Sequence, residues 1–569
     1  MKLLIEDFPY PADKVKGLLG SDQPFETDGF SRISNVGYYY NSSIKDCVFV
    51  LPKVILDYNE DDHAETIFGN FHPTDIIDID RSFRDEKLTV EQRDFIYNLS
   101  TWIYRSIAEF ARTNAELPEE QRSRIIYRKQ FSNVSLNGQN TDGTLIDIIL
   151  SLIKFANEDR DFFMFIIKNI HSGFNKINWR KTIGSKQAIV HNGVPHYFEV
   201  VNKKKQINFD EELLILFFSI LRYVRDKYGF PVNIPFNYEL ITGTKFESLL
   251  VGLGKARLLQ IKYKYFSDKA LQLWNLCYCF FAMAEQMAAK PSESEYLFVS
   301  NYNIVFETMI DELISDKNIP SALRDQRDGK IVDHIYPYAS LISPENIYHI
   351  GDSKYYKIGG AVHGNSEYKQ YTYTRNVIHF NLDLWLRYGE DSARERGALP
   401  YVDPLTDGYN VTPNFFISAE VDKDYNYTNP GVHLRKNLDG KNYSVTRHFK
   451  NRLFDRDTLW LSHYDINFLY VLALFVSPNQ SQRDDFKDEM RERFRRQIIE
   501  LLKGKYDFYK FIFSNLEEME SFVNTHFREL SGKIFHFNDT LLLALEKDCL
   551  DSSEISKKYQ QILVRFNLG

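Results

Sequence analysis

The sequence predicts an α+β protein of several domains: a strand-rich N-terminal region, a helical middle, an α/β region with a mixed central sheet, and a helical C-terminus. Three observations lead to this fold class. At 569 residues, the chain is longer than a single hydrophobic core can organise. Its first 80 residues contain short β-branched and aromatic runs, whereas residues 91–113 carry apolar side chains at three- and four-residue steps. From about residue 295, helical and strand-like segments alternate.

The change of period separates the first two regions. The strand-rich region covers residues 1–85, where the runs 35–40 and 47–56 flank a polar turn and predict two neighbouring strands. Residues 86–290 are expected to form a mainly helical domain, because the helical spacing of apolar side chains recurs in several later segments. The Pro-Ser-Glu-Ser stretch at 291–294 predicts a linker after this domain.

The second half of the chain is expected to contain two more regions. Residues 295–500 predict an α/β domain with the order helix, strand, strand, helix, strand. A polar stretch rich in Asn, Asp and Gly near 422–442 is expected to be an insertion in this domain. The apolar spacing after the Ser-Pro pair at 477–478 is helical, so residues 501–569 are expected to form a helical C-terminal region.

Composition argues against several classes of protein. The net charge of −8 argues against a generic polyanion binder, so any grip on nucleic acid must be local or come from another subunit. The four Cys residues form no disulfide framework, which predicts a reducing compartment. The N-terminus becomes acidic after three apolar residues, unlike a signal peptide, and the longest apolar run is about half a membrane span. We therefore expect a cytoplasmic protein with no membrane partner.

A pattern of charged residues in the middle of the α/β region indicates a catalytic site. Glu307 lies on an apolar helical segment, Asp333 on a strand-like run, and Asp352 and Lys354 on a second strand-like run. Residues i and i+2 of a strand point to the same side, so Asp352 and Lys354 should face one site while Ser353 turns away. Asp333 stands 19 residues before Asp352, which leaves enough chain for a hairpin that brings the two carboxylates together.

Such a site suits metal-assisted cutting of phosphodiester bonds. Carboxylate oxygens and waters are ligands that Mg²⁺ prefers, and the ion would polarise the scissile phosphate and activate a water. Asp333 and Asp352 are the expected metal ligands, and Glu307 would complete the metal shell or orient its water. Lys354 would hold that water or stabilise the charge of the transition state. The alternative is that Asp352 and Lys354 form a surface ion pair on an edge strand.

Two other groups of residues carry weaker signals. His463 and Asp465 on a strand, with Asp457 upstream, could form a second metal site or a polar strand end, and too few ligands converge to favour the metal. The Gly-Leu-Gly-Lys run at 252–255 departs from a phosphate-binding loop, because Ala follows the Lys where Ser or Thr should bind Mg²⁺. The chain therefore shows no recognisable nucleotide-hydrolysing site of its own.

Several stretches of the sequence resemble known nucleases. The order of helix Glu, strand Asp, Asp-x-Lys and a following Lys-Gln is similar to the PD-(D/E)xK nuclease superfamily. Outside this core, further segments resemble the LlaJI family of restriction endonucleases, which are relatives of the McrC nuclease subunit. These segments are residues 36–40, 50–53, 264–268, 369–373, 457–459 and 463–469, and together they span most of the chain.

The resemblance implies roles for five residues. Asp333, Asp352 and Lys354 match the metal-binding and catalytic positions of the superfamily. Glu307 matches the acidic residue of its first helix, and Gln370 matches a frequent downstream Gln. Two departures are a Val before the first Asp, where Pro is frequent, and a Thr four residues after the Gln, where a RecB-like nuclease has Tyr.

The resemblance also implies a function. It is that of a Mg²⁺-dependent endodeoxyribonuclease, with Mn²⁺ as an alternative ion, which cuts double-stranded DNA in a McrBC/LlaJI-like restriction system for antiviral defence. A separate McrB-like AAA+ subunit would recognise DNA and bind GTP, residues 1–85 would dock that partner, and nuclease domains would pair to cut both strands. Two alternatives remain open: a non-catalytic scaffold or adaptor of a nucleoprotein complex, and a stand-alone DNA repair or junction nuclease.

Overall fold

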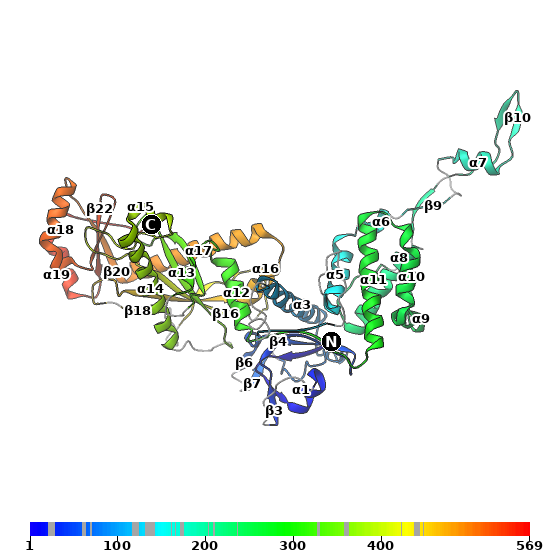
Figure 1. The fold of residues 1–569 in the computed structure, drawn as a ribbon, viewed down its shortest axis with the longest axis horizontal. Helices are drawn as coiled ribbons and strands as arrows, with labels where there is room; N and C mark the ends of the chain where they lie inside the picture. The colour runs from blue at the N-terminus through cyan, green and yellow to red at the C-terminus, as the bar shows by residue number, and fades with distance from the viewer. Residues whose placement is uncertain are drawn as a thin grey trace.

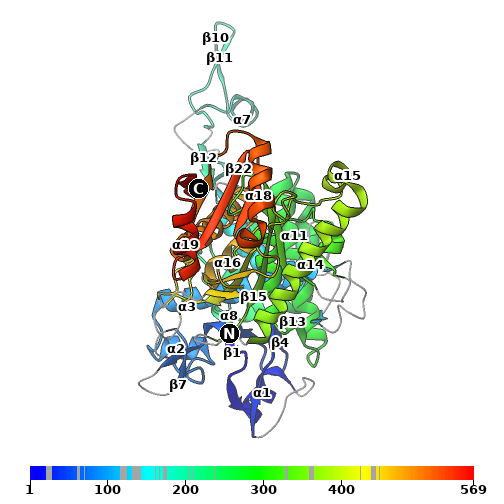
Figure 2. The ribbon, with the colours of Figure 1, turned by 90° about the vertical axis from the view of Figure 1, so that its left-hand side faces the viewer.

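The computed structural model shows an elongated molecule (Figure 1). The N-terminal sheet lies near its middle, with a group of helices on one side and the α/β and C-terminal regions on the other. A thin arm extends away from the helices and stands clear of the rest of the molecule in both views (Figures 1 and 2). The structure describes residues 1–20, 29–59, 64–68, 71–115, 125–130, 143–160, 162–165, 167–170, 176–202, 204–208, 211–235, 237–326, 331–357, 364–422, 424–436, 444–447 and 449–568.

The N-terminal region contains a five-stranded sheet with the strand order β1-β5-β4-β13-β8. These strands are β1 (Lys2–Ile5), β5 (Asp46–Leu51), β4 (Asn35–Asn41), β13 (Glu295–Ser300) and β8 (Ile126–Lys129). Around them lie β2 (Pro9–Pro11), α1 (Ala12–Leu19), β3 (Phe30–Arg32), η1 (Lys53–Ile55), β6 (Asp57–Asn59), β7 (Ala64–Thr66) and α2 (Ile79–Arg84). The predicted pair of strands around the polar turn is confirmed as the antiparallel pair β4–β5.

Strand β13 belongs to the N-terminal sheet, not to the α/β region where the sequence places it. The sequence places residue 295 at the start of the α/β region, but β13 pairs antiparallel with β4 of the N-terminal sheet. The rings of Tyr296 and Phe298 stack on Tyr39 of β4, and these aromatic contacts favour the N-terminal sheet. The α/β region therefore begins after β13.

The middle of the chain is mainly helical, as predicted. Its helices are α3 (Val90–Thr113), α5 (Leu145–Glu158), α6 (Phe162–Phe165), α8 (Glu212–Tyr228), α9 (Thr244–Ser248), α10 (Gly254–Ile261) and α11 (Asp268–Ala289), with the irregular turns η2 (Leu249–Leu253) and η3 (Lys262–Lys264) between them. Helices α3 and α5 both begin at capping boxes, whose N-cap residues are Thr89 and Thr144. Helix α3 also packs on the N-terminal sheet and on helices of the α/β region, so it connects the regions.

The arm is inserted between α6 and α8. Its stalk is the antiparallel pair β9 (Ile167–Ile170) and β12 (Lys204–Ile207), followed outward by α7 (Trp179–Ser185) and the hairpin β10 (Ile189–His191)–β11 (Val194–His196). Large apolar side chains are exposed along it, namely Trp179, Ile183, Ile189, Val190, Val194 and Phe198. Because isolated proteins rarely expose so many apolar side chains together, the arm has the properties of a contact surface.

The α/β region is built on a mixed sheet with the order β14-β15-β16-β19-β17, and β18 also pairs with β19. These strands are β14 (His334–Ala339), β15 (Asn346–Lys354), β16 (Pro413–Glu420), β17 (His433–Leu434), β18 (Ser444–Arg447) and β19 (Leu459–Asn467). β14 and β15 form an antiparallel hairpin, whereas β15, β16 and β19 run parallel. The prediction of an α/β region with a mixed sheet is therefore confirmed. Of the expected insertion near 422–442, residues 423 and 437–442 lie outside the described residues.

Helices cover both faces of this sheet. On one face, Phe306 of α12 (Asn303–Ile314) and Phe494 of α17 (Gln480–Lys505) share a core with Phe415 of β16. On the other face, Ile350 of β15 packs with Tyr373 of α14 (Gly364–Tyr388). The remaining helices of the region are α13 (Ser321–Arg324), α15 (Glu390–Glu395) and α16 (Phe468–Phe475).

The prediction of a helical C-terminus over 501–569 is wrong. Besides α18 (Leu516–Leu530) and α19 (Leu550–Lys558), this region contains a four-stranded sheet of the order β21-β22-β20-β23. Its strands are β20 (Tyr506–Phe511), β21 (Ile534–Phe537), β22 (Thr540–Glu546) and β23 (Leu563–Arg565). Strand β22 is a short apolar run buried on both sides, and such runs cannot be told from helix by periodicity. The missed signal is the two-residue turn before it, where Asn538 has a positive φ.

Among the described residues, no helix has the length and the apolar content needed to cross a membrane.

Candidate active site at the end of strand β15

Asp352 and Lys354 lie at the end of β15, between β14 and β16. Their exposed fractions are 1% and 9%, and the Lys354 Nζ donates a hydrogen bond of 2.5 Å to the Asp352 Oδ2. The Lys354 ammonium also lies over the ring of Phe416, 5.1 Å from its centroid. Because β15 is an internal strand and both groups are buried, the alternative of a surface ion pair on an edge strand is wrong.

Asp333 stands directly before β14 and meets Asp352 across the hairpin. In the hairpin, His334 lies opposite Gly351, so the next residues outward, Asp333 and Asp352, stand opposite each other. Burial, followed by the contact with Asp352 and the negative charges of Asp352 and Glu307, raises the pKa of Asp333 from 3.8 to about 8. The hairpin therefore brings the two predicted metal ligands together, as their sequence spacing predicts, and holds them as a pair of acids in a poorly solvated place.

Glu307 approaches from α12, on the opposite side of the sheet from α14. Burial and the charge of Asp352 raise the pKa of Glu307, while His334, Lys369 and Lys354 act against this shift. Glu307 therefore senses the charges of the Asp333–Asp352 pair. The three predicted acids thus lie in one electrostatic environment, although their ligand atoms do not all lie within 4.8 Å of one another.

Lys369 of α14 joins the same group, although the sequence pointed to it only as part of the Lys-Gln pair. Its ammonium lies 5.3 Å from the centroid of the Tyr373 ring. Although burial opposes it, the contact with Tyr373 and the charges of Asp333 and Asp352 raise the pKa of Lys369. A second cation therefore faces the acids from the α14 side. The sequence signal that could have identified Lys369 is its position one residue before Gln370, on the helix that follows β15.

Gln370 has a supporting position. It is fully buried, and its Nε2 donates hydrogen bonds of 3.2 Å to the Ile350 carbonyl of β15 and to the Asn414 Oδ1 of β16. Thr374, one turn later, donates to the same Asn414 oxygen at 2.8 Å. Both side chains fasten α14 to the two central strands, so the structure makes Gln370 a positioning residue for the Asp352 strand.

Beneath the acids, on the α12 face, a buried polar chain connects the same elements. The His334 Nε2 lies 2.5 Å from the Ser353 Oγ, and its Nδ1 lies 3.6 Å from the Asp311 Oδ1 of α12. Arg324 binds both oxygens of Asp311 at 2.9 Å. Although burial opposes it, the contacts with His334 and Arg324 lower the pKa of Asp311.

This Ser-His-Asp order is not a hydrolase triad. Ser353 and His334 are exposed by only 4% and 0%, so no substrate reaches the hydroxyl, and Arg324 already neutralises Asp311. The network instead holds α12, β14 and β15 together next to the residues that carry the site.

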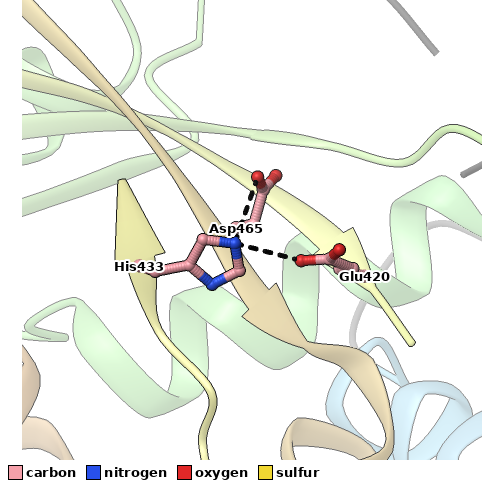
Figure 3. Close-up of side chains that lie close together, drawn as sticks. All are labelled: Glu420, His433 and Asp465. Atoms are coloured by element: carbon pink, nitrogen blue, oxygen red, sulfur yellow. Dashed lines mark ion pairs between the residues drawn. The ribbon is translucent and has the colours of Figure 1, made fainter. Parts of the chain in front are cut away.

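A second group of possible ligands lies on neighbouring strands of the same sheet (Figure 3). Glu420, His433 and Asp465 offer ligand atoms within 4.8 Å of one another. The His433 Nδ1 is 2.9 Å from the Gly431 carbonyl, which turns the Nε2 toward the two carboxylates, 3.4 Å from Glu420 and 3.8 Å from Asp465. The Arg435 Nε, however, donates to both Asp465 oxygens, at 2.9 and 3.2 Å. We interpret this second group as an ion-pair network, because Arg435 already compensates its most buried acid.

The second metal site considered from the sequence does not form in the described residues. His463 pairs with the Ser418 hydroxyl at 2.7 Å, and Asp457 binds Arg375 at 3.3 Å, away from Asp465. Burial and the charges of Arg435 and Lys354 lower the pKa of His463 to about 3, so it is neutral at ordinary pH. Asp465 does meet a histidine, but it is His433, from a strand that the sequence did not predict.

The donor chemistry favours the Asp333–Asp352 corner for a divalent cation. It offers carboxylate oxygens, which are hard ligands suited to Mg²⁺ and Mn²⁺. A cation between Asp333 and Asp352 would favour the deprotonated form of Asp333 and balance the charge of both carboxylates. Asp333 and Asp352 therefore fit such an ion as the side chains that would hold it. The ligand atoms of Glu307, Asp333 and Asp352 do not all lie within 4.8 Å of one another, so Glu307 would act from outside the metal shell.

Comparison with known proteins gives no match: no protein-family model, no curated protein and no solved structure matches the chain. The resemblance to restriction nucleases rests on the residues of this sequence alone.

Proposed function

We propose that this protein is a metal-dependent endonuclease subunit that cuts DNA in a McrBC/LlaJI-like restriction system. The observation that supports this most is the meeting of Asp333 and Asp352 with Lys354 beside them at 2.5 Å from Asp352. Paired carboxylates with an adjacent Lys are what metal-assisted hydrolysis of a phosphodiester requires. The mixed sheet, in which the β14–β15 hairpin is followed by α14 and the parallel strand β16, supports the proposal of a PD-(D/E)xK-like core.

Each side chain has a part in the proposed reaction. Asp333 and Asp352 would hold the divalent ion, which would polarise the scissile phosphate and acidify a water, and Glu307 would orient that water. Lys354 orients the attacking water or balances the negative charge that develops on the phosphate. Lys369, which faces the acids from α14, contributes a second positive charge on the substrate side of the site.

The partner we propose is a McrB-like AAA+ subunit that binds GTP and recognises DNA. The Gly-Leu-Gly-Lys run at 252–255 does not act as a phosphate loop in the described structure, because Lys255 pairs with Glu285 at 3.0 Å, as a surface ion pair does. The arm supports docking to another subunit, because its apolar side chains are exposed and it stands clear of the molecule (Figure 1). Paired nuclease regions would then cut both strands.

The test is cleavage of plasmid DNA with Mg²⁺ or Mn²⁺, by the chain alone and with the AAA+ subunit and GTP. We expect cutting by the wild-type chain with the partner and loss of cutting in Lys354→Met and Asp352→Asn. The matched control is Lys357→Met, which removes a lysine three positions later that pairs with Glu65 at 2.7 Å, outside the site.

The outcomes separate the alternatives. No cutting under any condition, with Asp352→Asn indistinguishable from wild type in every assay, would support a scaffold and contradict the proposal. Cutting of branched DNA by the chain alone, with no effect of the partner, would support a stand-alone junction nuclease instead.

A further inference from the structure

Helix α14 has a second functional face besides the one that covers the acids. Gln370 is bonded to the sheet, and Lys369 lies over the ring of Tyr373. Tyr368, Tyr371 and Arg375 follow the three- and four-residue steps of another side of the helix. Arg447 of β18 and Arg456 lie next to this side. We call the five residues Tyr368, Tyr371, Arg375, Arg447 and Arg456 the tyrosine–arginine stripe.

The stripe consists of rings paired with guanidinium groups. The Arg447 guanidinium lies over the Tyr368 ring, 4.2 Å from its centroid, and 57% of Tyr368 remains exposed. The Arg375 guanidinium lies 5.6 Å from the centroid of the Tyr371 ring. Planar guanidinium groups bind phosphates and stack on rings, and exposed tyrosines stack on bases.

The stripe is locally basic and anchored. The Asp457 carboxylate lies 3.3 Å from both the Tyr371 hydroxyl and an Arg375 nitrogen, and Glu367 lies 3.8 Å from Arg447. With Arg456 included, three arginines stand against these two carboxylates. This is the kind of local positive surface that a chain with a net charge of −8 needs if it is to hold a polyanion.

Its position connects it to the acids. Tyr368 is the direct neighbour of Lys369, whose charge acts on Asp333 and Asp352. A strand of nucleic acid whose phosphate lies at Lys354 and Lys369 would therefore have its next nucleotides over the stripe. A duplex hides the faces of its bases inside the stack, whereas an unpaired strand offers them to rings such as Tyr368.

We propose that the tyrosine–arginine stripe binds an unpaired segment of the strand being cut, with Tyr368 stacking on a base and Arg447 contacting the backbone. This inference rests on the proposed nuclease function for its substrate. It implies that the DNA is locally opened before it is cut, which is work that a nucleotide-driven partner would perform.

The same helix provides a matched control. At its other end, the Arg396 guanidinium lies 4.3 Å from the centroid of the Tyr388 ring, and 46% of Tyr388 is exposed. The chemistry of this pair is that of Tyr368 and Arg447, but it lies 20 residues further along α14 and away from the acids. If the position beside the acids, and not the residue type, is what matters for DNA binding, only the Tyr368 variant will lose binding.

The experiment measures binding of the full-length chain to a short labelled single strand by fluorescence anisotropy, in EDTA and at one moderate salt concentration. The duplex of the same sequence is measured in parallel. We expect the single strand to bind more tightly than the duplex, Tyr368→Ala to weaken its binding about tenfold, and Arg447→Met to weaken it by a similar factor. Tyr368→Trp should retain binding, and Tyr388→Ala should bind as wild type does.

Several results would overturn the inference. The first is that the single strand does not bind. The second is that the duplex binds more tightly and the stripe variants weaken only duplex binding. The third is that Tyr368→Ala and Tyr388→Ala weaken single-strand binding equally. Because the assay contains no divalent ion, it does not depend on cutting. If single-strand binding depends on the stripe but the chain never cuts DNA, the stripe proposal is supported and the nuclease proposal is contradicted. If Tyr368→Ala changes neither cutting nor single-strand binding, the nuclease proposal is supported and the stripe proposal is contradicted.

Discussion

Binding of a divalent cation to the acids at the end of β15 should release a proton from Asp333. A carboxyl group must be deprotonated before it can be a metal ligand. With its pKa raised to about 8, Asp333 is about nine-tenths protonated at pH 7 and about one-tenth protonated at pH 9. The number of protons released per ion should therefore fall from about 0.9 at pH 7 to about 0.1 at pH 9. Apparent affinity should rise about tenfold between pH 6 and pH 7 and level off above pH 8.

The sign of the stability change follows from the same pKa. Because burial raises the pKa of Asp333, the folded chain holds this proton more tightly than the unfolded chain. In the metal-free protein, the stabilising contribution of this group is complete below pH 3.8 and is lost as the pH rises toward 8. A bound cation should reverse this loss, since it favours the deprotonated form.

Isothermal titration with Mn²⁺ in two buffers of different ionisation enthalpy measures the released protons at each pH. Asp333→Asn should abolish the release at pH 7. Glu420→Gln, in the second group of possible ligands, should leave it unchanged. The reasoning is refuted if wild type releases no proton at pH 7, or if Asp333→Asn releases as many as wild type. If Glu420→Gln alone abolishes the release, the ion binds at the second group and the assignment of the metal is wrong.

Three further predictions concern the residues around the acids. Lys354→Met should reduce cutting by about 100- to 1000-fold without changing the Mn²⁺ affinity, measured by titration, because its charge acts on the reacting groups; an equal loss of affinity would contradict this. His334→Phe should lower the free energy of unfolding by about 1–3 kcal/mol, measured by denaturant titration, since it leaves buried polar partners unsatisfied; unchanged stability would show that the network is dispensable. Gly351→Ala should cost about 1–3 kcal/mol, because the added Cβ would meet the ring of Phe415, whereas Gly17→Ala has open space and should cost nothing; equal effects would rule out the packing argument.

Local patterns in the sequence were enough for much of the fold. Helical spacing of apolar residues predicts α3 and α5, and β-branched runs around a polar turn predict β4 and β5. The two-residue alternation of a strand also predicts that Asp352 and Lys354 face the same site. These features succeed because they depend on residues that are neighbours in the chain.

Other features depend on partners that a local pattern does not contain. Strand β13 follows the linker in sequence but pairs with β4, because its aromatic side chains find their stacking partners there. The C-terminal sheet was missed because short apolar runs suit a buried strand as well as a buried helix, and only neighbouring strands decide between them.

For the candidate site, the sequence by itself predicted the residues, Glu307, Asp333, Asp352 and Lys354, by type and spacing. Only the tertiary structure decided that Asp352 and Lys354 are a buried pair on an internal strand, because burial depends on the strands and helices that pack on either side. It alone brought in Lys369, through the packing of α14 over the acids. A pKa shift such as that of Asp333 likewise arises from distance and desolvation, which exist only after distant segments have packed together.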